Sequence, residues 1–216
     1  METQFYKKVN IPVGKLVLKG DLCIPKNVNG IIIFSHGSGS TRLSSRNRTV
    51  ANRLHEKKFG TLLFDLLTEE ESRHYYNRFD IDLLTKRLAG ATEWLERFPA
   101  AKDCRIGYFG ASTGAASALQ ATAQMTEVGA VVSRGGRPDL VMDILKHVEA
   151  PTLLIVGSLD VDVLQLNKAA YMRLVCKKKL ELVEGATHLF EEPGKMEIVA
   201  ELAGNWFEKY LSSVKV

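Results

Sequence analysis

The chain has 216 residues, 45% of them hydrophobic and 25% charged, with a formal net charge of +4 at pH 7. This length and composition fit a single, fairly large globular domain over residues 1–216 with a substantial core. The longest basic run is Lys177-Lys178-Lys179, too short to indicate a nucleic-acid partner. No run of roughly 18 apolar residues that could cross a membrane occurs, and no apolar signal segment precedes the first predicted strand.

The three cysteines, Cys23, Cys104 and Cys176, are scattered along the chain without Cys-x-x-Cys spacing. An odd and scattered set argues against a disulfide framework and against a zinc site. It is typical of a protein of the reducing cytoplasm. We therefore expect a cytoplasmic protein without a metal or a membrane partner, and the sequence leaves monomer and homodimer open.

The first third of the chain predicts a sheet edge followed by buried strands. Residues 4–24 alternate loosely between apolar and polar residues, which predicts a β-hairpin at the antiparallel edge of a sheet. Residues 30–35 form a continuous β-branched run, typical of a strand buried on both faces. A helix is expected over about 43–58 and a further buried strand over 61–64.

Residues 66–78 form the one long polar connection, and long loops in compact domains are often functional. After it, apolar residues at helical spacing over 81–98 predict an amphipathic helix. The remaining elements alternate in type: a strand before Gly110, a helix, strands over 130–133, 150–156 and 179–183, and helices ending near 147, over 164–175 and over 195–211. This alternation predicts an α/β fold with a mostly parallel sheet covered by helices on both faces.

The segment Gly110-Ala111-Ser112-Thr113-Gly114 lies between a predicted strand and a predicted helix. Gly-x-Ser-x-Gly in that place is the pattern of a nucleophile elbow, where a sharp turn exposes the serine hydroxyl above the sheet. The alternatives are a glycine-rich turn before a buried helix and a phosphate-binding loop. Neither Gly-x-Gly-x-x-Gly nor Gly-x-x-x-x-Gly-Lys-[Ser/Thr] occurs, which disfavours the phosphate loop.

Ser112, Asp160 and His188 each follow a separate predicted strand, where ligands bind in such sheets. Their order, serine, acid and histidine, is that of the α/β-hydrolase triad. The serine needs an imidazole to take its proton, and the imidazole needs a carboxylate that fixes its tautomer. Asp162 and, less plausibly, Asp65 compete with Asp160 for the role of the acid.

The oxyanion that forms during such a reaction needs backbone N–H donors. The residue after the nucleophile, Thr113, supplies one candidate, and the loop over residues 36–40 supplies the other, with Ser38 the first choice. His36 is expected to order this loop, and it lies where it would also line the substrate site.

Five arginines fall near the carboxyl ends of the predicted strands: Arg42, Arg46, Arg48, Arg134 and Arg137. Arg46 and Arg48 lie on a predicted helix and could simply be solvated or paired with Glu69 to Glu71. The glycines between Arg134 and Arg137 would let the backbone approach a ligand closely, so we expect at least one of these two arginines to bind an anionic group on the substrate.

Four segments together carry a family resemblance: His-Gly-Ser-Gly-Ser at 36–40, Gly-Ala-Ser-Thr-Gly at 110–114, Ser-Arg-Gly-Gly-Arg-Pro-Asp at 133–139 and Gly-Ala-Thr-His-Leu-Phe at 185–190. Over nearly its whole length the chain resembles the dienelactone-hydrolase-related branch of the α/β hydrolases, especially small bacterial members, some fused to a phosphoribosyltransferase domain. The resemblance implies the α/β-hydrolase fold and a cofactor-free serine hydrolase with Ser112, Asp160 and His188 as its triad. Dienelactone hydrolases have a cysteine where this chain has Ser112, so the family name is a poor guide to the substrate.

We therefore expect hydrolysis of a small, soluble carboxylic ester, thioester or lactone through an acyl-enzyme. The core fold uses nearly the whole chain, which leaves no sizeable lid for interfacial lipids. An amide or peptide hydrolase would share every motif. A binding module that kept the fold and lost catalysis is the alternative from another class.

Overall fold

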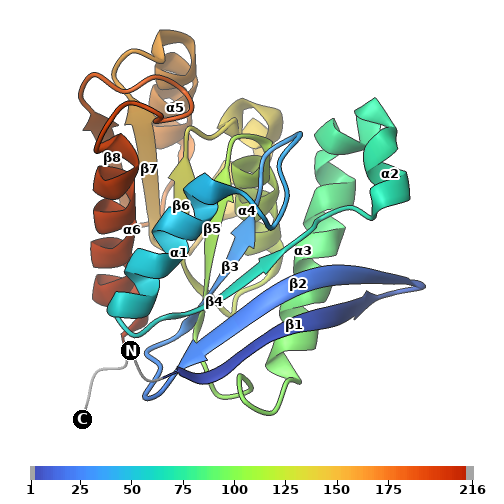
Figure 1. Cartoon of the computed structure of the whole chain (residues 1–216). Helices are drawn as coiled ribbons and strands as arrows, with labels where there is room; N and C mark the ends of the chain where they lie inside the picture. Colours follow the sequence, from blue (N-terminus) through green and yellow to red (C-terminus); the bar gives the residue numbers. More distant parts are fainter. Residues whose placement is uncertain (1–2, 213–216) are drawn as a thin grey trace.

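The structure is a computed structural model that describes residues 3–212. Its strands are β1 (Thr3–Val13), β2 (Leu16–Pro25), β3 (Ile31–Ser35), β4 (Gly60–Phe64), β5 (Ile106–Ala111), β6 (Val128–Arg134), β7 (Thr152–Gly157) and β8 (Lys178–Val183). Its helices are α1 (Ser45–Glu56), α2 (Glu69–Arg73), α3 (Ile81–Glu96), α4 (Thr113–Gln124), α5 (Val161–Arg173) and α6 (Lys195–Leu211), with 3₁₀ segments η1 (Tyr75–Phe79) and η2 (Pro138–His147). These elements confirm the α/β class (Figure 1).

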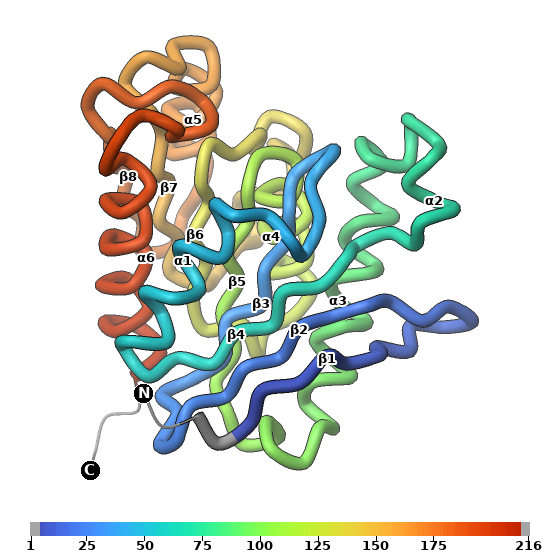
Figure 2. Tube along the Cα trace, viewed as in Figure 1, coloured from blue at the N-terminus to red at the C-terminus, as the bar shows by residue number. Residues whose placement is uncertain are grey.

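The strands form one sheet of eight in the order β1-β2-β4-β3-β5-β6-β7-β8. The pairs β1–β2 and β2–β4 are antiparallel, and β4, β3, β5, β6, β7 and β8 run parallel to one another. The predicted hairpin therefore forms the antiparallel edge of an otherwise parallel sheet. Parallel strands place their carboxyl ends along one rim, and the loops that follow β3, β5, β6, β7 and β8 gather there (Figure 2).

Helices cover both faces of the sheet, as the sequence predicts. Helices α1 and α6 lie on one face, and α3, α4 and α5 lie on the other (Figure 1). Strand β3 shows why its sequence lacks alternation: Ile31 and Ile33 join one core cluster, whereas Ile32 and Phe34 join the other. A strand that is buried on both faces needs apolar side chains on both.

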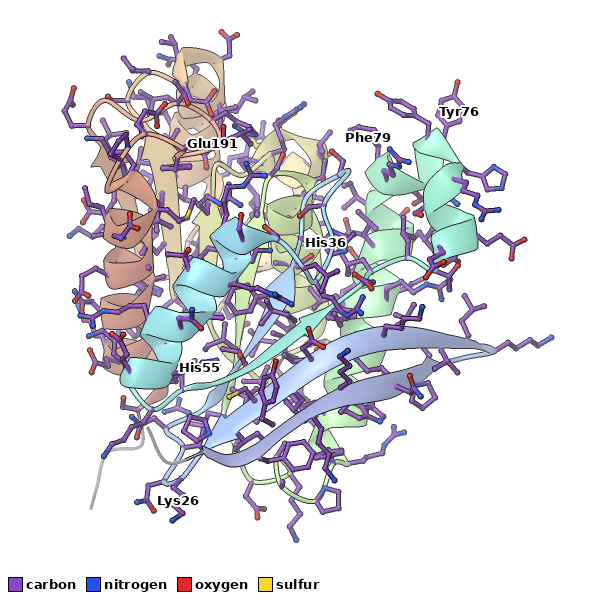
Figure 3. The ribbon with its side chains drawn as sticks, in the orientation of Figure 1. Lys26, His36, His55, Tyr76, Phe79 and Glu191 are labelled. Carbon is purple, nitrogen blue, oxygen red and sulfur yellow. The ribbon has the colours of Figure 1, made fainter. Side chains whose placement is uncertain are left out.

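Residues 66–78 were predicted to be one irregular loop, and this was wrong. The segment contains α2 and η1. Thr68 begins α2 with a capping box: its Oγ1 accepts the Glu71 N–H at 3.2 Å, and the Glu71 carboxylate accepts the Thr68 N–H at 3.0 Å. Tyr75 and Tyr76 of η1 are both exposed, and the Tyr76 side chain projects into solvent (Figure 3).

Candidate active site

Ser112 occupies the sharp turn between β5 and α4. Its backbone has φ 52° and ψ −121°, a region that residues other than glycine rarely adopt. The flanking glycines make the turn possible, because a Cβ on Gly110 would lie 2.5 Å from the Ala115 Cα, and one on Gly114 only 2.1 Å from the Ser35 carbonyl oxygen. The geometry is that of a nucleophile elbow, which holds the serine side chain above the sheet.

Backbone hydrogen bonds fix this turn to the neighbouring strand. The Ser112 N–H donates to the Arg134 carbonyl at 3.1 Å, and the Ser112 carbonyl accepts the Arg137 N–H at 3.1 Å. These two bonds therefore attach the end of β6 and the loop after it to the elbow.

His188 and Asp160 are hydrogen-bonded at the same rim. The Nδ1–H group of His188 donates to Asp160 Oδ2 at 2.6 Å. Asp160 is the residue before α5, where an aspartate ordinarily caps the helix, but its carboxylate makes no capping bond and accepts from the histidine instead. This bond engages Nδ1 and leaves Nε2 on the other side of the imidazole ring.

The loops that carry this pair are joined to each other. The Leu159 N–H donates to the Ala186 carbonyl at 3.0 Å, and the Gly185 N–H donates to Ser158 Oγ at 2.8 Å. Gly157 permits the close approach, since a Cβ there would lie 2.2 Å from the Ala186 oxygen. The acid loop and the histidine loop thus form one unit.

The two competing acids lie elsewhere. Asp162 is exposed in the first turn of α5. Asp65 accepts two hydrogen bonds from Arg42, from its backbone N–H at 2.8 Å and from Nη1 at 2.6 Å. Of the three carboxylates that the sequence offered, Asp160 is the one in contact with His188.

His188 also lies next to the elbow, with its ring packed over Gly135. A Cβ on Gly135 would lie 3.4 Å from His188 Cε1, and this glycine follows Arg134, the strand partner of Ala111. Within residues 3–212 no hydrogen bond joins Ser112 Oγ to His188 Nε2, although the sequence predicts one. Such bonds are often long before substrate binds and shorten in the reacting complex.

The expected oxyanion donors are adjacent, but one of them is in use. A Cβ on Gly37 would lie 3.1 Å from Ser112 Cβ, so the loop after β3 passes directly over the elbow. The Ser38 N–H in this loop donates to Thr113 Oγ1 at 2.9 Å. The Thr113 N–H belongs to the first residue of α4, whose amide has no partner within the helix.

His36 orders the loop and offers no free nitrogen to a ligand. Its Nδ1–H donates to the Gly37 carbonyl at 3.0 Å, and its Nε2 accepts the Leu66 N–H at 3.1 Å. Figure 3 shows the position of His36. Burial lowers the pKa of His36, in agreement with a neutral imidazole. His36 also lines the cavity described below, so its contact with substrate stays a prediction, one that does not use its ring nitrogens.

The two arginines after the elbow differ from each other. Arg137 is half exposed, and its Nε and Nη2 hold both Asp139 oxygens at 2.9 and 2.8 Å, so a substrate anion would have to displace a carboxylate. Arg134 is the last residue of β6 rather than part of a loop, and it is 6% exposed. The glycines between them serve packing: Gly135 lies under His188, and a Cβ on Gly136 would lie 2.1 Å from Ser133 Oγ.

The other three arginines are paired, although not with Glu69 to Glu71. Arg42 binds Asp65, Arg46 binds Glu191 at 2.7 Å, and Arg48 lies 3.6 Å from Asp21. Glu69 and Glu71 pair instead with Lys19 and Arg87.

A cavity of about 600 Å³ opens beside the loop after β3, and Ser112, Asp160 and His188 are not among its lining residues. Its walls include the first residues of β2 from Leu16 to Lys19, the loop from His36 to Thr41, and the segment from Asp65 to Ser72. The sequence analysis did not anticipate Leu18 or Leu67 here, because only the sheet order brings β2 beside β4 and hence beside this loop. The volume is within the usual range for a small-molecule site.

Two classes of site find no support among the described residues. No group of three or more His, Cys, Asp or Glu side chains in residues 3–212 is placed to hold a metal ion. Across the same residues, no helix is both long and apolar enough to cross a bilayer.

Comparison with known proteins places the chain. The model of the dienelactone hydrolase family matches residues 18–215. The chain belongs to the dienelactone hydrolase family. It is 50% identical to a crystallised dienelactone hydrolase from Anabaena variabilis, with a TM-score of 0.94 over 98% of this chain and 100% of the other. The family and its solved members support a carboxylic-ester hydrolase on the α/β-hydrolase fold.

Other relatives of this dienelactone hydrolase family member carry a different name or share less sequence identity. Two curated Mycobacterium tuberculosis proteins, each called a putative phosphoribosyl transferase, are 52% identical over 206 residues. The match covers 95% of this chain but 46% of theirs, so the chain spans about half the length of these relatives. An esterase from Pyrococcus furiosus shares the fold, with 20% identity and a TM-score of 0.76 over 96% of this chain and 92% of the other.

Proposed function

We propose that this protein is a serine hydrolase that cleaves a small carboxylic ester, thioester or lactone through an acyl-enzyme on Ser112. His188 is the general base and Asp160 orients it. The observation that carries the proposal is the 2.6 Å bond between Asp160 and His188, beside a serine whose backbone has the geometry of a nucleophile elbow. We take residues 1–216 as one catalytic domain.

In the first half of the reaction, Ser112 Oγ attacks the substrate carbonyl carbon while His188 Nε2 takes the hydroxyl proton. Asp160 stabilises the resulting imidazolium through Nδ1–H. The C–O bond to the alcohol (C–S for a thioester) then breaks, and His188 returns the proton to the leaving group. In the second half, His188 takes a proton from water, whose oxygen attacks the acyl carbon, and Ser112 leaves with that proton.

The oxyanion is held by the Thr113 N–H and the Ser38 N–H. The latter has to be released by Thr113 Oγ1, a neutral acceptor. An oxyanion is a stronger competitor, because hydrogen bonds to an ionised acceptor are about twice as strong as neutral ones. In the free enzyme the Thr113 hydroxyl therefore keeps the Ser38 N–H directed at the elbow.

The cavity beside the loop after β3 accommodates a non-reacting part of the substrate. Leu16, Leu18, Leu67 and Leu84 give it apolar walls, and its volume of about 600 Å³ fits a small molecule. Interfacial lipids fit less well, because α2 and η1, the helical segments beside this cavity, have five residues each and form no sizeable lid.

Labelling with a fluorophosphonate probe tests the proposal. We expect covalent modification of the wild type at Ser112 and none of Ser112→Ala, since the probe reports an activated serine. A folded wild type that resists the probe would favour the binding-module alternative. The turnover of a matched aryl ester and anilide distinguishes the ester hydrolase from an amide hydrolase, and we expect the ester to be preferred.

A further inference from the structure

The two ends of the sheet differ in how their edges are protected. Strand β8 forms one end, and the β1–β2 hairpin forms the other (Figure 1). An edge strand offers unpaired N–H and C=O groups to another chain, and proteins often block it with bulges, prolines or lysines. Strand β1 has all three devices: a register shift near its start, the adjacent Lys7 and Lys8, and Pro12. Strand β8 has no proline, and its pairing with β7 shows no register shift.

The even-numbered residues of β8 form its outward edge. The Thr152 N–H donates to the Lys177 carbonyl at 2.8 Å, and the Ser158 N–H donates to the Val183 carbonyl at 3.0 Å. Because backbone groups alternate in direction along a strand, the odd-numbered residues face β7 and the even-numbered ones, 178, 180 and 182, face away from the sheet. Among residues 3–212, β7 is the only strand that pairs with β8. The outward edge is therefore open to a strand from another chain.

Two opposite charges lie side by side on this strand. Lys179 and Glu181 are two residues apart, so they share one face of the sheet, and they form an ion pair with 61% and 26% of their side chains exposed. An antiparallel second copy of β8, related by a two-fold axis at Leu180, would place each Lys179 opposite the Glu181 of the other copy. An axis at either charged residue would instead place a charge opposite its own copy, which is destabilising.

The backbone is compatible with an axis at Leu180. This axis sets the outward-facing, even-numbered residues of the two strands opposite one another, as the hydrogen-bonded pairs of an antiparallel ladder require. Lys179 and Glu181 then occupy the non-hydrogen-bonded positions, where opposite Cα atoms are about 4.5 Å apart and side chains approach most closely. The register that pairs the charges is therefore also one that pairs the backbone.

Apolar side chains beside β8 offer further surface to a second copy. Met172, Val175 and Leu182 are 79%, 72% and 48% exposed. Met172 is in the last turn of α5, Val175 lies between α5 and β8, and Leu182 is in β8 itself. Standard interfaces bury about 1,200–2,000 Å² in total, so a pair of strands needs flanking surface of this kind.

We propose that two copies of this chain associate through β8, antiparallel about a two-fold axis at Leu180, so that their sheets become continuous. The interface is isologous, since the same residues serve both copies. A second copy suits this edge because the charge pattern of the strand is complementary to itself. The inference does not depend on the proposed hydrolase function.

Sedimentation of the purified protein over a range of concentrations tests the inference. We expect wild type to dimerise and Lys179→Glu to raise the Kd of the dimer at least about tenfold, because two attractive cross-strand pairs become repulsive. The double variant Lys179→Glu/Glu181→Lys exchanges the charges and should restore the Kd to within about threefold of wild type. Lys7→Glu, on the opposite edge strand, is the matched control and should leave the Kd unchanged. Circular dichroism of each variant guards against a folding defect.

Cross-linking tests the axis. In this register each Leu180 lies opposite its own copy, with Cα atoms about 5.5 Å apart, within the range of about 4.4–6.8 Å that disulfides accept. Oxidation should therefore link Leu180→Cys into a covalent dimer, but neither Lys179→Cys nor wild type with its native cysteines. A wild type that stays monomeric at millimolar concentration would overturn the inference. So would a dimer that Lys179→Glu does not weaken, that the exchanged charges do not restore, or that Leu180→Cys does not link.

Discussion

The two sides of the Ser112 site are built differently. On one side, Asp160 and His188 belong to loops that follow neighbouring parallel strands and that exchange backbone hydrogen bonds. On the other side, the cavity lies between the β1–β2 hairpin and α2, which are joined across the rim by the exposed ion pair Lys19–Glu69 at 2.8 Å. Exposed ion pairs contribute little stability, typically about 0–1 kcal/mol. The proposed reacting groups, Asp160 and His188, are therefore held by bonds between their loops, whereas the hairpin and α2 meet across the cavity through an exposed ion pair.

This contrast suggests a division of roles, in which the residues around Ser112 carry out the reaction and the cavity wall sets the preference among substrates. A substitution among the reacting groups should affect all substrates alike, because every substrate uses them in the transition state. A substitution in the cavity wall should change the order of preference among substrates. The following experiments test this division.

Removal of Ser112 or His188 should have the largest effect. We expect Ser112→Ala and His188→Ala each to lower kcat by on the order of 10⁶, and the double variant to be little worse, because triad members act as a unit. Esterase assays with a short and a long acyl ester check this and should show the same loss for both. Losses that multiply in the double variant would contradict the assigned roles.

Asp160→Asn should lower kcat by on the order of 10⁴ without unfolding the protein, since an amide supports the wrong imidazole tautomer. Asp162→Asn is the matched control, two residues away and exposed. Its activity should stay near wild type. If instead Asp162→Asn carries the loss, the acid of the site is misassigned.

On the cavity side, Leu67→Trp should fill part of the volume next to Leu18. We expect kcat/KM for a long acyl ester to fall about tenfold relative to an acetyl ester, because pocket contacts worth one or two methylenes discriminate by that much. Ile198→Trp, on the outer face of α6, is the control for an added indole. A uniform loss for both esters would place the cavity outside the substrate path.

The smallest expected effect is the pH dependence of the free energy of unfolding that comes from two buried histidines. Burial lowers the pKa of His36 on the cavity side and of His55 on α1, so the unfolded chain binds protons more readily than the folded one. The free energy of unfolding should therefore be fully retained above about pH 6.5 and fall below it, by at most about 1.4 kcal/mol per pH unit for each histidine. Denaturant unfolding at pH 7.5 and 5.5 measures the slope, and His55→Gln should reduce it. An unchanged slope would mean that His55 titrates alike in both states.

Much of this architecture could be predicted, because it rests on local patterns. Continuous apolar runs predicted the buried strands, and the parallel sheet is confirmed. The elbow followed from Gly110 and Gly114, whose missing Cβ atoms the turn requires. The capping box from Thr68 to Glu71 was also readable, and attention to it would have predicted α2.

The features of the site that could not be predicted depend on contacts between segments that are distant in the sequence. Arg134 and Arg137 look equivalent in sequence. Strand β6 ends at Arg134, one residue later than predicted, and Arg134 is buried. Arg137 lies in the loop, where it pairs with Asp139. The bond from the Ser38 N–H to Thr113 Oγ1 arises only because two loops meet over the elbow. The cavity likewise depends on the order of strands, which local patterns do not specify.

The packing of α6 against β5 and β6 has a consequence for how the chain folds. Gly107 of β5 and Gly129 of β6 leave room for Leu211 at the end of α6, since a Cβ on either would lie 2.6 or 2.7 Å from its methyl carbons. Leu211 follows Gly107 by roughly half the chain, so this closure has a high contact order and carries a large loop entropy. The strand that positions Ser112 stays uncovered on one face until α6 docks. Acquisition of activity during refolding should therefore track the docking of α6 rather than the earlier formation of the sheet.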